Sequence, residues 1–110
     1  VRTEIGAAVA LDPHEPSYRL LAGGFALQDG AYAAAEAHFE AGLVTESSPF
    51  GRARLLHFGA MAAQAGGHSR RAAALRRELG EVHHPRALPY QRIARRGNVA
   101  VGVQLCDLSS

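Results

Sequence analysis

Residues 16–43 read PSYRLLAGGFALQDGAYAAAEAHFEAGL, and residues 53–79 read ARLLHFGAMAAQAGGHSRRAAALRREL. The two stretches follow one pattern at an offset of 37 positions, in which a small pair, a turn glycine and an alanine recur. These residues are Ala22-Gly23, Gly30 and Ala35 in the first stretch, and Gly59-Ala60, Gly67 and Ala72 in the second. Each stretch predicts a helix, a glycine turn and a second helix, with both alanines buried where helices cross. A unit of this kind cannot bury its apolar face alone, so we expect the units to stack into a helical solenoid.

The pattern resembles the tetratricopeptide repeat, a family with small, Gly, aromatic, Ala and Phe positions at fixed offsets within about 34 residues. Residues 8–13 resemble the end of a preceding unit, and Pro13 matches the proline that closes the family's repeat. The resemblance covers about residues 3–82 and implies an all-α, helix-turn-helix solenoid of about two and a half repeats. The chain departs from the family pattern in three respects. Arg19 and Leu56 stand where the family prefers Trp, and Arg76 stands where it prefers Phe. Three extra residues lie within 44–52.

The periodicity predicts five helices before residue 83. They cover about residues 3–12, 16–29, 31–45, 50–65 and 69–81. Beyond them, His83-His84-Pro85 and Leu88-Pro89 interrupt the helical pattern, and residues 98–108 alternate as a β-strand does. We therefore expect tetratricopeptide-like repeats over 1–82. Residues 83–110 are expected to be a linker and extended tail, which either begins a second domain or caps the array.

Length and composition limit the class of protein. A chain of 110 residues is one domain, or one small domain with a piece of another. The lone Cys106 excludes an internal disulfide, and no apolar run approaches the roughly 20 residues that cross a membrane. No signal peptide is visible, so we expect a cytoplasmic protein. Because the chain begins at Val1 inside a helical pattern, we expect it to be a fragment of a longer one.

Charge is divided unevenly along the chain. Residues 1–50 carry two Arg and seven acidic residues, whereas residues 51–110 carry ten Arg and three acidic residues. Such a split favours weak self-association by head-to-tail stacking, docking of the 85–110 tail onto an end, or recruitment of an anionic partner. The alternative is a solvated helix face combined with codon bias.

The family resemblance also implies a binding surface. In tetratricopeptide repeats the first helix of each pair lines a concave groove that holds an extended peptide or a partner helix. By the family's offsets the groove positions are Ser17, Leu20, Gly24, Leu27, Gln28, Arg54, His57, Met61 and Gln64. The Lys/Asn set that clamps a carboxylate in the chaperone-binding members is not present. We expect a partly hydrophobic protein segment with some negative charge as partner; alternatively, these residues cover a neighbouring repeat.

The tail carries a second resemblance. Arg92 and Arg96, followed by a strand pattern and by Asp107 and Ser109, resemble the opening of a PilZ domain. That family binds the bacterial messenger cyclic di-GMP, and arginine forks hold phosphate bidentately and stack on guanine. Fewer residues separate Arg96 from Asp107 than the family usually has. The alternative for this segment is an ordinary basic linker.

No residue set predicts catalysis. The chain has no nucleophile elbow, phosphate-cradling glycine loop or paired carboxylate motif, so we expect neither an enzyme nor a cofactor. His83, His84 and His68 form no metal-ligand set and are expected to be solvated turn residues. We expect a scaffold for a protein or peptide partner, with no nucleic acid. The rival hypotheses are a regulator with a cyclic di-GMP-binding domain and an accessory repeat domain of a larger enzyme.

Overall fold

The computed structural model describes residues 2–95, and this part of the chain is all-α, without a strand. The helices are α1 (Arg2–Leu11), α2 (Pro16–Gln28), α3 (Tyr32–Thr45), α4 (Pro49–Ala65), α5 (Ser69–Gly80), the 3₁₀ turn η1 (Pro85–Ala87) and α6 (Leu88–Arg95). The all-α class is confirmed. Each of the five expected helices is present, with ends that differ from the expectation by no more than one residue.

Two turns of the same geometry join α2 to α3 and α4 to α5. Gly30 has φ of 76° and Gly67 has φ of 85°, a backbone conformation that glycine adopts without strain. Each turn is closed by the same hydrogen bond, from the Ala31 amide to the Ala26 carbonyl (2.8 Å) and from the His68 amide to the Ala63 carbonyl (2.7 Å). Such bonds satisfy carbonyls that the end of a helix leaves without partners. The repetition at 37 positions is therefore a structural one.

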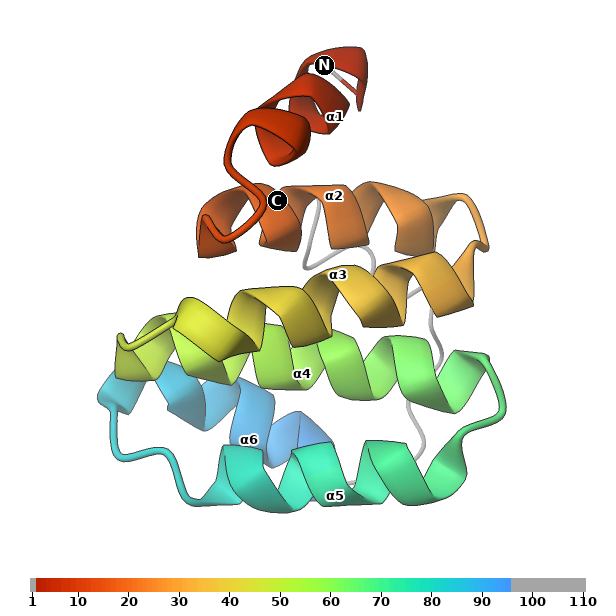
Figure 1. The fold of residues 1–110 in the computed structure, drawn as a ribbon. Helices are drawn as coiled ribbons and strands as arrows, with labels where there is room; N and C mark the ends of the chain where they lie inside the picture. The colour runs from red at the N-terminus through yellow and green to blue at the C-terminus, as the bar shows by residue number, and fades with distance from the viewer. Residues whose placement is uncertain (1, 96–110) are drawn as a thin grey trace.

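Helices α2 to α5 follow one another in antiparallel succession, and the core lies between them (Figure 1). Ala35 and Ala72 are fully buried, as expected, and they occupy equivalent places in the two units. Gly23 lies under the ring of Phe39, where an added Cβ would come within 2.5 Å of a ring carbon. Small residues thus allow the helices to approach closely enough for the aromatic side chains to be enclosed.

Residues 85–95 differ from the expected linker, because they form η1 and α6 and pack against α4 and α5. Pro85 and Pro89 were interpreted as helix breakers. Pro85 instead opens η1 and Pro89 lies in the first turn of α6, where the missing amide hydrogen is not needed. The strand expected over 98–108 lies outside the described residues.

The position of α6 repeats a relationship seen earlier in the chain. Helix α4 packs against α3 and α2, and α6 packs against α5 and α4 (Figure 1). Gln91 fixes this arrangement, since its Nε2 donates to the carbonyls of Leu79 (3.0 Å) and Val82 (2.9 Å) at the end of α5. Residues 85–95 thus pack on the last two long helices, α4 and α5.

Candidate functional site

The predicted groove residues lie on α2 and α4 but differ in exposure. Leu27, His57 and Met61 are buried, with 1%, 5% and 5% of their surfaces exposed. Leu27 and Met61 belong to one core cluster, with Leu20 packed at its edge. The remaining positions reach the surface in part or fully. Leu20, Arg54 and Gln64 are half-buried, Ser17 and Gln28 are exposed, and Gly24 is buried. A partner protein could therefore contact only the exposed and half-buried residues among the predicted groove positions.

His57 is enclosed by aromatic rings. Its ring centroid lies 4.8 Å from that of Phe58 and 4.7 Å from that of Tyr90 on α6. Helix α6 thus covers a groove position of α4, in the way that an additional repeat would. His57 is thus in contact with another helix of the same chain. This contact is in line with the alternative interpretation of the groove positions, in which they contact neighbouring helices and not a partner protein.

A basic and aromatic cluster next to His57 was not predicted. The ring of Phe50 has the Arg54 guanidinium 5.5 Å away and the Arg86 guanidinium 4.2 Å away, both at cation–π range. Phe50 also stacks on Tyr90 with centroids 6.4 Å apart. The cluster holds the start of α4 against η1 and α6. Its sequence signal was the pair of prolines, Pro85 and Pro89, at positions that can start helices.

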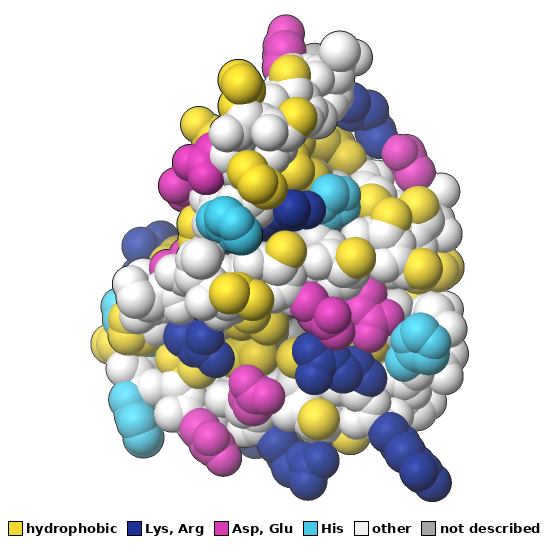
Figure 2. All heavy atoms as spheres, viewed as in Figure 1, with side chains coloured by type: hydrophobic (Ala, Val, Ile, Leu, Met, Phe, Trp, Pro, Cys, Tyr) yellow, Lys and Arg dark blue, Asp and Glu magenta, His cyan; other side chains and the backbone are white. Residues whose placement is uncertain are grey.

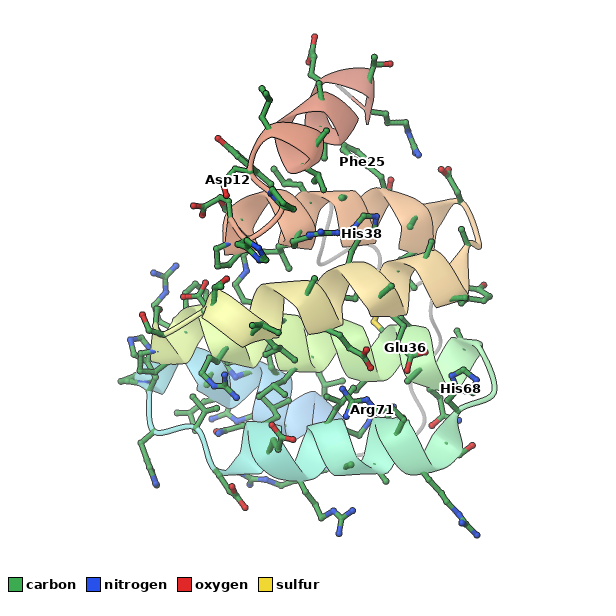
Figure 3. The ribbon with its side chains drawn as sticks, viewed as in Figure 1. Asp12, Phe25, Glu36, His38, His68 and Arg71 are labelled. Carbon is green, nitrogen blue, oxygen red and sulfur yellow. The ribbon has the colours of Figure 1, made fainter. Side chains whose placement is uncertain are left out.

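The acidic first half and the basic second half of the chain meet between α3 and α5. Glu40 Oε1 pairs with Arg71 Nη2 at 3.0 Å, and Glu36 Oε2 lies 2.9 Å from His68 Nδ1. Figure 2 shows acidic and basic side chains side by side on this face. Figure 3 labels Glu36 on α3, Arg71 on α5, and His68 in the turn before α5. The uneven charge along the sequence is therefore partly neutralised within the molecule, and the two ends are not simply of opposite sign.

Arg19 and His38 form a polar contact between α2 and α3. Arg19 Nη1 lies 3.0 Å from His38 Nδ1, and Arg19 Nε donates to the Pro13 carbonyl at 2.8 Å. Because an arginine only donates, Nδ1 accepts and the ring proton is on Nε2. Burial and the positive charge of Arg19 lower the pKa of His38 below its ordinary value of 6.5. This arginine, at a position where the family prefers Trp, thus joins the two helices through hydrogen bonds.

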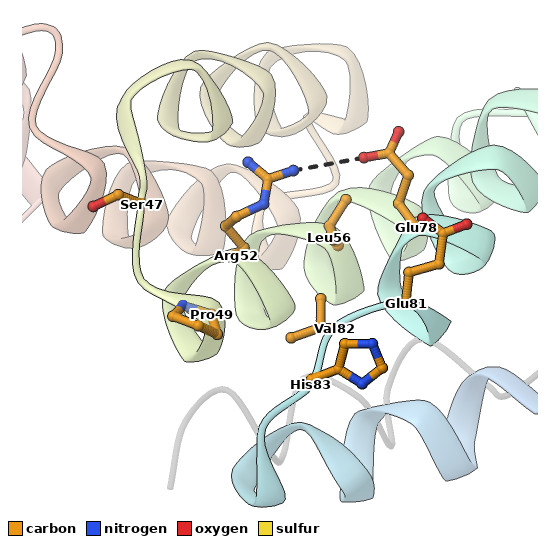
Figure 4. A pocket seen from close by; sticks show the side chains of 8 residues that line it. All are labelled: Ser47, Pro49, Arg52, Leu56, Glu78, Glu81, Val82 and His83. Carbon is orange, nitrogen blue, oxygen red and sulfur yellow. Dashed lines mark ion pairs between the residues drawn. The ribbon is translucent and has the colours of Figure 1, made fainter.

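A hollow of about 390 Å³ lies between the start of α4 and the end of α5 (Figure 4). It is lined by Ser47, Pro49, Arg52, Leu56, Glu78, Glu81, Val82 and His83. Arg52 Nη2 and Glu78 Oε2 face each other at 3.7 Å. A charged ligand would have to compete with this internal pair, so the hollow offers no ready-made site for an ion.

The histidines have structural partners. His68 is bonded to Glu36, and His84 Nδ1 accepts the Arg86 amide at 3.1 Å in the turn that starts η1. Within residues 2–95, no three His, Cys, Asp or Glu side chains gather as a metal ion would require. The same part of the chain contains no helix with the length and apolar character needed to traverse a bilayer.

Of the residues that resemble the PilZ opening, the structure describes only Arg92. It lies on α6 with its side chain exposed. Arg96, Asp107 and Ser109 lie outside the described residues. Whether these four side chains come together stays a prediction.

Comparisons with known proteins leave the family open. No protein-family model matches the chain, and neither the curated proteins nor the solved structures gave a match. The likeness to tetratricopeptide repeats therefore rests on the chain's own features. These are the 37-residue pattern and the two turns that share one hydrogen-bond geometry.

Proposed function

We propose that this chain is a tetratricopeptide-like protein-interaction module that binds a segment of a partner protein on the face formed by α2 and α4. The observation that carries the proposal is the equivalence of the two helical units, with Gly30 and Gly67 in the same backbone conformation and the same closing hydrogen bonds. Stacked units of this kind create extended surfaces, which repeat proteins use to bind other chains. The first helices of the units, α2 and α4, pack directly on each other.

The side chains on this face match a partly apolar peptide. Leu20 supplies apolar surface above the core cluster that contains Leu27 and Met61. The Gln64 side chain carries amide hydrogens that can donate to the backbone of an extended segment, while its Oε1 accepts from Arg76 Nη1 at 3.2 Å. Arg54 places a guanidinium at the edge of the face, which favours a carboxylate in the partner.

The test uses peptides selected from a random library on the immobilised chain, with affinities measured by fluorescence anisotropy. The combined change Leu20→Glu and Arg54→Glu should weaken binding of the selected peptides by about tenfold or more, because it replaces an apolar and a basic contact with negative charge. Ala37→Glu is the matched control, since Ala37 is exposed on α3, the second helix of its unit. It should leave the affinity within about twofold.

The choice of variants avoids core residues. Leu27→Ala and Met61→Ala would open cavities and lower the stability of the fold, so a loss of binding would be ambiguous. If the Leu20 and Arg54 variant binds as the unmodified chain does, the α2–α4 face is not the binding surface. If the library yields no binding peptide, the proposal of an interaction module fails.

The two rival hypotheses have less support in the described residues. Of the four residues proposed to bind cyclic di-GMP, the described part of the chain includes only Arg92. An accessory role in a larger enzyme is compatible with the same α2–α4 face. In that case the partner would be another part of the enzyme, and the binding surface would still be the α2–α4 face.

A further inference from the structure

A second hollow, of about 340 Å³, lies between α5 and α6, the two helices farthest along the described chain. Its lining is Ala73, Arg76, Arg77, Gly80, Gln91, Ala94 and Arg95. We refer to it as the α5–α6 cleft. It shares no lining residue with the hollow of Figure 4, although α5 contributes to both.

The α5–α6 cleft is lined in part by a position at which the second helical unit departs from the first. Arg76 stands 37 positions after Phe39, which is fully buried over Gly23. Arg76 is only half-buried, and its Nη1 donates to Gln64 Oε1 on α4 at 3.2 Å. A charged side chain therefore lies where the first unit has an aromatic ring, and the cleft stays polar at that end.

The charges around the α5–α6 cleft have one sign. Three of its described lining residues are arginines, and none is acidic. Glu78, the acidic residue of α5, and Glu81, which follows the helix, line the other hollow, beside Arg52. Neither η1 nor α6 contains an acidic residue. Positive charge in this cleft is thus not balanced by the carboxylates of its own helices.

The remainder of the lining is small and mainly apolar. Ala73 and Ala94 contribute methyl groups, and Gly80 contributes no side chain. A ligand that fills the cleft therefore buries apolar surface on small residues while its charged groups meet Arg77 and Arg95, which are both exposed. Guanidinium groups bind carboxylates through two parallel hydrogen bonds, and apolar burial adds to the affinity of such pairs.

We propose that the α5–α6 cleft is a second binding surface, which takes a segment of another protein that combines carboxylates with apolar side chains. Charge complementarity points to a partner that supplies carboxylates, because three arginines and no acidic residue are among the described residues that line the cleft. A nucleic acid fits less well. Single strands are held by aromatic stacking in addition to basic groups, and none of the residues within 2–95 that line this cleft is aromatic. The inference is independent of the α2–α4 face.

The experiment measures binding of three fluorescent probes to the whole chain. The first is a peptide of alternating Glu and Leu, the second replaces each Leu with Ser, and the third is a single-stranded oligonucleotide of equal charge. The test variant is Arg77→Gln with Arg95→Gln, which removes charge at exposed positions and leaves the helices intact. The control is Arg70→Gln, an exposed arginine of α5 that does not line the cleft.

The expected result is that the Glu/Leu peptide binds more tightly than the other two probes. The double variant should weaken its binding by about tenfold or more, and the control by less than about twofold. Equal losses in the two variants would show non-specific attraction and overturn the proposal. Equal binding of the Glu/Ser peptide, tighter binding of the oligonucleotide, or no binding of the Glu/Leu peptide would also overturn it. Binding of library peptides at the α2–α4 face is measured separately and does not depend on this outcome.

Discussion

At the scale of single residues, two helical glycines allow close packing against large side chains of the core. An added Cβ at Gly23 would lie 2.5 Å from the Phe39 ring, and one at Gly42 would lie 2.9 Å from Leu55. Both partners are buried core residues and have little room to move. In contrast, a Cβ added at Gly6 in α1 would meet nothing within 4 Å. Two helical glycines of the same chain therefore respond differently to the same substitution.

Gly23→Ala should lower the free energy of unfolding by about 1–3 kcal/mol, because the new methyl group overpacks the contact with Phe39. Gly6→Ala should instead be neutral or raise it by about 0.5–1 kcal/mol, since alanine favours a helix and the space is open. Urea denaturation measures both changes. Equal effects of the same sign at the two positions would contradict the packing described for α2 and α3.

His38 gives the molecule a pH dependence with a definite sign. Burial and the charge of Arg19 hold the pKa of folded His38 below 6.5, so the unfolded chain binds a proton at a pH where the folded chain does not. The contribution that neutral His38 makes to the free energy of unfolding is complete above pH 6.5. This contribution is lost as the pH falls from 6.5 to the pKa of His38 in the folded chain, and below that pKa the free energy no longer changes because of His38.

The variant His38→Gln tests this sign, because glutamine can accept the Arg19 hydrogen bond but does not titrate. The stability of the unmodified chain should fall relative to that of the variant as the pH drops below 6.5. Denaturant midpoints measured across this range give the difference. Parallel curves for the two proteins would show that His38 does not titrate differently in the folded state.

At the scale of helices and turns, α6 depends on a hydrogen-bonded contact that no sequence pattern indicated. Gln91 is 7% exposed, and its side chain donates to two carbonyls at the end of α5. Those carbonyls lie where a helix runs out of its own donors. Gln91 thus holds α6 against the last turn of α5 and the residues that follow it.

Gln91→Ala should lower the free energy of unfolding by about 1–3 kcal/mol, because two carbonyls lose a buried donor. Arg92→Ala, at the exposed neighbouring position, should change it by no more than about 0.5 kcal/mol. Thermal or urea unfolding followed by circular dichroism gives both values. A Gln91 variant as stable as the Arg92 variant would show that α6 is not held through this side chain.

Local chemistry explains why five helices were predictable and the sixth was not. Gly30 and Gly67 require a left-handed turn conformation, and such signals act within a few residues. Pro85 and Pro89 are ambiguous locally, since proline both ends helices and opens them. Whether each proline ends or opens a helix depends on contacts with α4 and α5, and the periodicity of the sequence carries no information about such contacts.

The candidate site shows the same limit. The offsets of the tetratricopeptide pattern predicted which positions belong to the first helices, and these positions lie on α2 and α4. Their exposure was not predictable. His57 is enclosed by Tyr90, which comes from the unpredicted helix α6, and Leu27 and Met61 join a core that spans three helices. Burial is a tertiary property, so a single helix pattern does not determine it.

At the scale of the whole molecule, charge pairing changes what the uneven sequence implies. The pairs Glu40–Arg71 and Glu36–His68 join the two halves of the chain within one molecule. Fewer acidic groups of the first half are therefore free to meet the arginines of a second copy. The electrostatic basis for head-to-tail self-association is weaker than the sequence alone indicated.

We therefore expect the apparent mass by sedimentation to be the same at low and at high salt. Attraction between oppositely charged ends would increase the mass at low salt, because screening is weakest there. The double change Glu36→Gln and Glu40→Gln provides a comparison that breaks the internal pairs. A larger apparent mass at low salt than at high salt for the unmodified chain would support head-to-tail self-association.

The central claim is that the equivalent first helices α2 and α4 form one protein-binding face. Its most direct test is an NMR titration of the ¹⁵N-labelled chain with a peptide selected from the library. The account predicts that the amide shifts change along α2 and α4, around Leu20, Gln28, Arg54 and Gln64, while Ala33 and Ala37 on α3 stay unchanged. Shift changes that avoid α2 and α4, and appear instead on the exposed side of α3, would contradict it.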